Sequence, residues 1–90
     1  MKIAINECYG GFGLSPKAKK MLPKGVNYLT MDRTDPRLVE VIERLGYEAN
    51  GPFARIAIFD IPDDATDYKI WEYDGAETLI YVVDGKMYEY

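Results

Sequence analysis

Two Asp-Gly pairs divide the last third of the chain into segments of strand-like composition. Asp74-Gly75 and Asp84-Gly85 each lie between runs rich in tyrosine, isoleucine, valine and threonine. An Asp-Gly pair favours the two-residue turn in which both central φ angles are positive, and this turn joins antiparallel strands. The sequence therefore predicts a C-terminal β-meander made of residues 67–73, 76–83 and 86–90.

Two short helices are expected before the meander, because a capping residue precedes a proline at two places. Ser15-Pro16 opens a segment that ends near Leu22, and Asp35-Pro36 opens a longer one. Apolar residues of the longer segment recur at helical spacing and form one stripe, made of Leu38, Val41, Ile42 and Leu45. The glycine that follows this stripe is typical of a helix end.

The remaining segments complete an α+β fold. Residues 2–6 and 53–61 are expected to form strands, the second in a central position, and residues 26–31 a short strand or an extended link. No repeat, linker or low-complexity segment divides the sequence. We therefore expect a single domain over residues 1–90, with two short helices packed on a mainly antiparallel sheet that ends in the meander.

The composition argues against several classes of function. The chain has 15 acidic and 11 basic residues, and its net charge of −4 disfavours binding of duplex nucleic acid. It has no histidine and one cysteine, which excludes histidine-based catalysis, a His/Cys zinc site and an internal disulfide. No apolar run reaches the about 18 residues that a membrane span needs. We expect a cytoplasmic protein without catalytic residues, metal or cofactor.

A glycine-rich loop, Cys8–Gly13, lies between the first expected strand and the first expected helix. This order recurs in anion-binding sites, because glycines let a ligand approach main-chain N–H groups and the helix start closely. The candidate phosphate contacts are Gly10, Gly11 and Gly13, and the candidate stacking faces for a base or ribose are Tyr9 and Phe12. The spacing matches neither a Walker loop nor the dinucleotide fingerprint, so a tight structural turn is the competing interpretation.

Other side chains suited to an anionic ligand occur outside this loop. Arginine binds phosphate in a bidentate manner, and the candidates are Arg33, Arg37 and Arg55, with Asn50 as a further polar contact. A solvated surface is the competing interpretation for the first two. Several aspartates lie beside prolines, as turn and capping residues do, which disfavours a metal-dependent hydrolase.

The segment Ile5–Ser15 resembles the opening of a widespread group of small proteins from phages, prophages and bacteria. Further similar segments are Arg33–Pro36, Leu38–Glu40, Leu45-Gly46, Glu48–Gly51, Ile61–Asp64 and Glu72–Gly75. The similarity covers most of residues 1–75, whereas the tyrosine-rich end differs. The resemblance implies that this chain acts on the defence system of a host cell. Small accessory phage proteins inhibit host defence proteins or sequester nucleotide-derived immune signals, often as homo-oligomers.

These observations lead to one main hypothesis and one alternative. The main hypothesis is a homodimeric or larger binder that sequesters an ADP-ribose-type or cyclic nucleotide immune signal without catalysis. Its phosphates would lie on the glycines at the Ser15 helix start, with the aromatic, arginine and asparagine side chains around them. The alternative is a protein-binding inhibitor of a host defence enzyme, with the tyrosine-rich meander as its contact surface.

Overall fold

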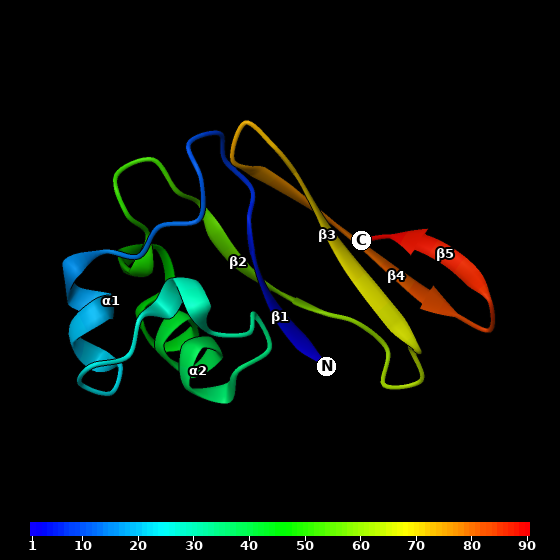
Figure 1. The fold of residues 1–90 in the computed structure, drawn as a ribbon, viewed down its shortest axis with the longest axis horizontal. Helices are drawn as coiled ribbons and strands as arrows, with labels where there is room; N and C mark the ends of the chain where they lie inside the picture. The colour runs from blue at the N-terminus through cyan, green and yellow to red at the C-terminus, as the bar shows by residue number, and fades with distance from the viewer.

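The computed structural model describes residues 1–90 and shows three layers (Figure 1). The helical layer contains α1 (Pro16–Met21), α2 (Pro36–Leu45) and the short 3-10 helices η1 (Tyr28–Thr30) and η2 (Gly46–Ala49). The second layer is the antiparallel pair of β1 (Lys2–Asn6) and β2 (Ile56–Asp60). The third layer is an antiparallel sheet in the order β3 (Asp67–Tyr73), β4 (Ala76–Val83) and β5 (Lys86–Glu89). The predicted α+β class and the predicted meander are both confirmed.

Strand β1 lies between the helices and the meander, so both of its faces are buried. Ala4 packs with Ile56 in the core beneath the helices. Ile3 and Ile5 point the other way and pack with Leu79 of β4 in a second core. The expected sheet is therefore split into two, with β1 as the element that both cores share.

Helix α2 has the ends that its sequence predicts. The carboxylate of Asp35 accepts a hydrogen bond from the main-chain N–H of Arg37 at 2.9 Å, and Pro36 occupies the first turn. Leu38, Val41 and Ile42 of the apolar stripe are buried against β1 and β2. This burial anchors the helical layer on the two-stranded sheet.

Two segments differ from the sequence expectation. Residues 26–31 contain η1 rather than a strand, because the side chain of Asn27 accepts from the N–H of Leu29 at 3.1 Å and closes a tight turn. Strand β2 begins at Ile56 rather than at residue 53, after a turn in which Ala54 donates to Gly51. β2 pairs only with β1, which corrects the expected central position to an edge.

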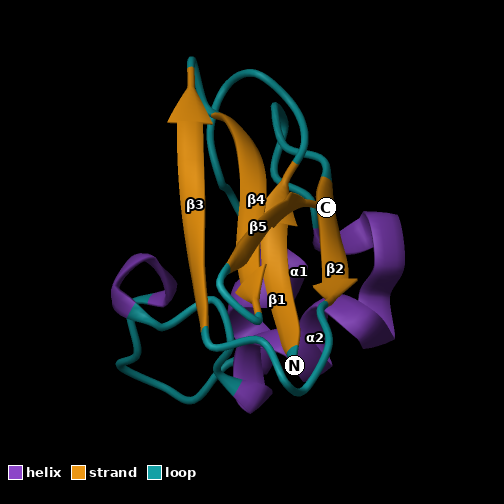
Figure 2. Cartoon of the chain, turned by 90° about the vertical axis from the view of Figure 1, so that its right-hand side faces the viewer, coloured by secondary structure: helices purple, strands orange, loops and turns teal.

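Both Asp-Gly turns have the predicted conformation. The φ angles are 51° and 89° at Asp74-Gly75 and 51° and 75° at Asp84-Gly85. Figure 2 shows β3 at the margin of the meander, with β4 beside it on one side only. Neither helix has the length and apolar character needed to cross a membrane.

Candidate functional site

The glycine-rich loop is held in place by a buried amide, that of Asn6 at the end of β1. Its Nδ2 donates to the main-chain oxygens of Cys8 at 2.8 Å and Gly75 at 2.7 Å. Its Oδ1 accepts from the main-chain N–H of Arg55 at 2.9 Å. Because this side chain is completely buried, its hydrogen bonds fix the loop, the β3–β4 turn and the segment before β2 to one point.

The loop also packs directly on the β3–β4 turn. The N–H of Gly10 donates to the carbonyl oxygen of Asp74 at 2.9 Å. Gly10 and Gly11 have φ angles of 116° and 99°, a region that side chains other than glycine rarely adopt. A Cβ atom at Gly75 would collide with the main-chain nitrogens of Gly10 and Gly11. Gly10, Gly11 and Gly75 are therefore needed in part for the turn and its packing, in agreement with the interpretation of the loop as a tight structural turn.

Residues 50–54 form the opposite wall of the loop. The N–H of Gly51 donates to the carbonyl oxygen of Gly13 at 2.7 Å, and Phe53 packs against Gly10. The glycine-rich loop, the 50–54 segment and the β3–β4 turn thus lie next to one another along one side of the molecule, the upper edge of Figure 1. A cavity of about 220 Å³ opens between the glycine-rich loop, the 50–54 segment, α1 and η1, and its lining includes Gly10–Gly13, Lys19, Tyr28 and Phe53.

This loop cavity combines unpaired main-chain donors with a positive charge. The N–H groups of Gly11, Phe12 and Gly13 make no hydrogen bond within the chain. The ammonium group of Lys19 lies 5.8 Å from the centre of the Tyr28 ring and pairs with no carboxylate. Such an arrangement attracts an anion and offers an aromatic face beside it.

The start of α1 offers fewer free anion-binding groups than the sequence predicts. The helix has six residues, and the hydroxyl of Ser15 already accepts from the N–H of Ala18 at 3.1 Å. Lys17 pairs with Glu48 at 2.8 Å, and this hydrogen bond raises the pKa of Lys17. The groups free to bind an anion therefore come from the loop and Lys19 rather than from the helix start.

The two aromatic residues predicted to contact a ligand have different surroundings. Phe12 lines the cavity, and its ring centre lies 6.1 Å from that of Tyr28 and 3.8 Å from the guanidinium carbon of Arg33. Tyr9 is 65% exposed and does not line the cavity. Phe12 is thus a wall of the cavity, and Tyr9 belongs to the outer surface.

Arg33 is engaged within the protein and does not line the cavity. Its Nη1 and Nη2 contact the two carboxylate oxygens of Glu77 at 2.6 and 2.7 Å, and Nη1 also donates to the carbonyl of Ala4 at 3.2 Å. The N–H of Ala4 donates to the carbonyl of Arg33, and that of Asn6 donates to Glu77 at 2.8 Å. This ion pair therefore closes the edge of β1 that β2 leaves free.

The other three predicted polar contacts also lie outside the loop cavity. Arg37 pairs with Asp35, and the hydrogen bonds from its side chain and its main chain hold the pKa of Asp35 below the ordinary value. The Oδ1 of Asn50 accepts from the N–H of Ile56 at 2.8 Å. Arg55 is exposed and lines a separate cavity of about 290 Å³ between the two sheets.

Among the lining residues that the sequence does not predict, Lys19, Tyr28 and Phe53 contribute a charge or an aromatic ring. Lys19 lies one helical turn after Ser15, and its N–H donates to the Ser15 carbonyl at 3.0 Å, so the capping signal could have located it. Tyr28 and Phe53 reach the cavity only through η1 and the contact between Gly51 and Gly13. No local pattern indicates those long-range contacts.

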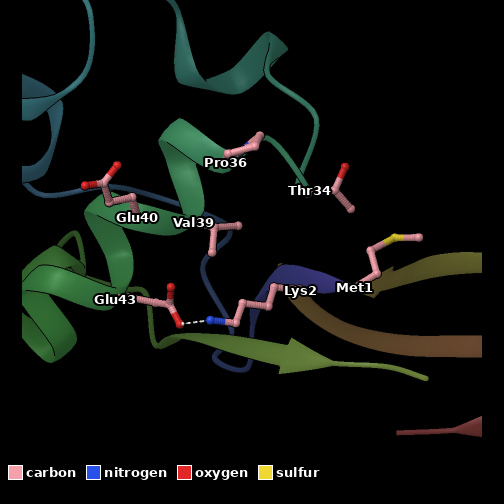
Figure 3. Close-up of a pocket in the computed structure, with 7 residues that line it drawn as sticks. All are labelled: Met1, Lys2, Thr34, Pro36, Val39, Glu40 and Glu43. Atoms are coloured by element: carbon pink, nitrogen blue, oxygen red, sulfur yellow. Dashed lines mark hydrogen bonds and ion pairs between the residues drawn. The ribbon is translucent and has the colours of Figure 1, made fainter. Parts of the chain in front are cut away.

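The largest cavity lies elsewhere, between α2 and the start of β1 (Figure 3). It measures about 350 Å³, and its lining residues are Met1, Lys2, Thr34, Pro36, Val39, Glu40 and Glu43. Its charged groups are paired within the chain: Lys2 with Glu43 at 2.8 Å, and Glu40 with Arg44 at 3.3 Å. The hydrogen bond from Lys2 to Glu43 raises the pKa of Lys2. The charged side chains of this cavity are therefore paired, whereas Lys19 of the loop cavity is not.

Metal chemistry and similarity to known proteins add no further candidate. Histidine, cysteine, aspartate and glutamate side chains form no group of three that could hold a metal ion. Comparison with models of protein families, with curated proteins and with solved structures found no match. The loop cavity is thus the candidate site on the basis of its geometry.

Proposed function

We propose that this protein binds a small nucleotide-derived anion in the loop cavity and holds it without chemical change. One observation carries the proposal: Phe12 and Gly13, whose N–H groups are unpaired, line the same cavity as Lys19, which pairs with no carboxylate. In the setting that the resemblance to phage proteins implies, the ligand is an immune signal of the host cell. Capture would keep that signal from its receptor.

A phosphate group suits the polar side of the cavity. Successive main-chain N–H groups in a glycine-rich turn form a concave site for an anion. Lys19 adds a full positive charge, and hydrogen bonds between charged partners are shorter and stronger than neutral ones. Because Gly13 has no side chain and a Cβ atom there would meet no other atom within 4 Å, a phosphate oxygen can approach its nitrogen atom closely.

A ribose or a base suits the aromatic side of the cavity. Phe12 and Tyr28 form its inner wall, and Phe53 is 75% exposed beside it. The volume of about 220 Å³ is smaller than the roughly 300–1,000 Å³ of sites that enclose a drug-sized ligand. The cavity therefore accommodates one phosphate and the neighbouring sugar or base, and a larger ligand extends over Phe53.

Capture without turnover is consistent with the groups that line the cavity. Its ionisable side chains are Lys19 and Tyr28, and no carboxylate, cysteine or histidine lies among them. Nucleophilic or acid–base catalysis usually needs a nucleophile and a base within hydrogen-bonding reach of each other. The proposed function rests on affinity alone.

Isothermal titration calorimetry with ADP-ribose and with cyclic AMP tests the proposal. We expect Lys19→Glu to weaken binding at least about 30-fold, because it replaces a charge-assisted contact by repulsion. Lys20→Glu is the matched control, since it makes the same charge change on the same helix outside the cavity, and it should change affinity by less than about threefold. Absence of binding for every nucleotide tested would refute the proposal.

A second function, inhibition of a host protein by direct binding, is favoured by exposed aromatic residues along the same side of the molecule. Tyr9, Phe53 and Tyr73 are 65%, 75% and 75% exposed. Aromatic side chains contribute much of the binding energy at protein interfaces. This function predicts a stoichiometric complex with one host protein that Phe53→Ser and Tyr73→Ser weaken, with no nucleotide bound. Nucleotide binding that Lys19→Glu abolishes would favour the first proposal.

A further inference from the structure

The strand edges of this molecule are covered to different degrees. Arg33 and Glu77 close the free edge of β1, and Asn50 and Tyr90 each accept a main-chain N–H from the outer edge of β2. β3 is an edge strand of seven residues, and neither another strand nor a capping arginine covers its outer side. An uncovered edge of this kind is a template for pairing with another chain.

The register of the meander determines which main-chain groups β3 presents at that edge. Tyr73 and Ala76 flank a two-residue turn, so they exchange hydrogen bonds with each other. In agreement, the carbonyl of Val82 points toward β3 and accepts from the N–H of Thr66 at 2.9 Å. Because the pattern alternates, the odd-numbered residues of β3 bond to β4. The main-chain groups of the even-numbered residues, from Tyr68 to Glu72, point outward. At the start of the strand the carboxylate of Asp67 accepts from the outward N–H of Tyr68 at 2.8 Å, so Ile70 and Glu72 present the free donors.

We propose that two copies of this chain pair through their β3 edges in antiparallel orientation. The two three-stranded sheets then form one continuous sheet across a two-fold axis at Ile70. In this register Ile70 faces Ile70 of the second copy, and Tyr68 faces Glu72 of the second copy. Each of these pairs brings outward main-chain donors opposite outward main-chain acceptors.

The side chains at this register are complementary. On the open face of the sheet, Lys69 lies directly opposite Trp71 of the second copy, in a non-hydrogen-bonded pair whose side chains are close together. An ammonium group over an indole ring is a cation–π contact, and the two-fold axis forms it twice. Trp71, which is 57% exposed in the single chain, is covered by this contact. No two like charges face each other along the seven paired residues.

Neighbouring registers lack this complementarity. A shift of two residues keeps the main-chain groups matched, but in one direction it places Lys69 opposite Lys69 of the second copy, which is repulsive. In the other direction it leaves Asp67 and Tyr68 without a strand residue opposite. The remaining edge of the meander, β5, has only four residues and offers a shorter ladder.

Pairing through β3 and ligand binding in the loop cavity involve different residues. No residue of β3 lines the loop cavity, so pairing and nucleotide binding can be measured separately. Pairing also explains the exposure of Trp71 in the single chain, because Lys69 of the second copy covers its ring in the dimer.

Sedimentation equilibrium on four proteins tests the pairing. The wild type should form a dimer of the 10.3 kDa chain. Trp71→Lys should raise the dimer dissociation constant at least about tenfold, since each lysine now faces a lysine. The exchanged variant, Lys69→Trp with Trp71→Lys, restores the opposed pair and should return to within about threefold of wild type. Met87→Lys, at an exposed position of β5, is the control and should leave the constant unchanged.

Hydrogen exchange locates the interface. The amides of Ile70 and Glu72 should become protected as protein concentration rises, whereas those of Met87 and Glu89 should not. A protein that stays monomeric at millimolar concentration overturns the proposal. So does a dimer that Trp71→Lys leaves intact, or a folded exchanged variant that does not dimerise. Circular dichroism of each variant establishes that it is folded.

Discussion

The two Asp-Gly turns of the meander share a sequence and a backbone conformation but have different surroundings. Gly75 is buried, its carbonyl accepts from Asn6, and the neighbouring carbonyl of Asp74 accepts from Gly10. At Gly85, in contrast, a Cβ atom would meet no other atom within 4 Å. Local sequence therefore sets the shape of each turn, whereas distant contacts make the first one a support for the glycine-rich loop.

The largest expected effect comes from removing the amide that joins the first turn to the loop. Asn6→Leu leaves the carbonyls of Cys8 and Gly75 and the N–H of Arg55 without a partner. Each unpaired buried group costs about 1–3 kcal/mol, so we expect the free energy of unfolding to fall by roughly 3–5 kcal/mol. Urea denaturation measures this loss. Asn27→Leu, at an exposed turn cap, should cost about 1 kcal/mol or less, and an equal loss in both variants would contradict the account.

The turns themselves provide the next comparison. Gly75→Ala and Gly85→Ala both place a side chain at positive φ, which costs about 1–2 kcal/mol in either turn. At Gly75 the new Cβ also meets the main chain of Gly10 and Gly11, so its cost in thermal or urea unfolding should exceed that of Gly85→Ala by about 2 kcal/mol or more. Equal costs would mean that the loop does not depend on the first turn.

The ion pair behind the first turn should show a smaller effect. Glu77 has a side chain only 6% exposed, while Arg33 is partly exposed. We expect Arg33→Met to destabilise the protein by about 2 kcal/mol, below the 3–5 kcal/mol of a fully buried pair. A double-mutant cycle with Glu77→Leu should give a coupling free energy of about 1–2 kcal/mol. The exposed pair of Glu40 and Arg44 is the control, with an expected coupling below about 0.5 kcal/mol. Equal coupling free energies for the Arg33–Glu77 and Glu40–Arg44 pairs would contradict a structural role for Arg33.

The sequence predicts those parts of the fold that depend on neighbouring residues. The caps of α2 and both turns of the meander are examples, since their hydrogen bonds and φ angles involve residues a few positions apart. Asn6 and Gly75 are 69 positions apart, and Arg33 and Glu77 are 44 apart. Their contacts depend on which segments fold against each other, and no local pattern carries that information.

In the candidate site too, features set by neighbouring residues are predictable, and those set by distant contacts are not. The glycines of the loop are recognisable because their spacing and neighbours are local. Arg33 and Asn50 have the right chemistry for an anion, but both bond to the main chain of other segments. Tyr28 and Phe53 enter the cavity only because η1 and the 50–54 segment fold against the glycine-rich loop. Residue type alone could not separate the side chains that hold the loop from those that line the cavity.

The most direct test of the ligand site is a titration of nitrogen-15-labelled protein with ADP-ribose and with cyclic AMP, followed by NMR. Binding in the loop cavity predicts saturable shifts of the amide signals of Gly11, Phe12 and Gly13 for at least one ligand, and loss of those shifts in Lys19→Glu. Unchanged loop signals at saturating ligand, or shifts confined to the cavity between Lys2 and Glu43, would contradict it.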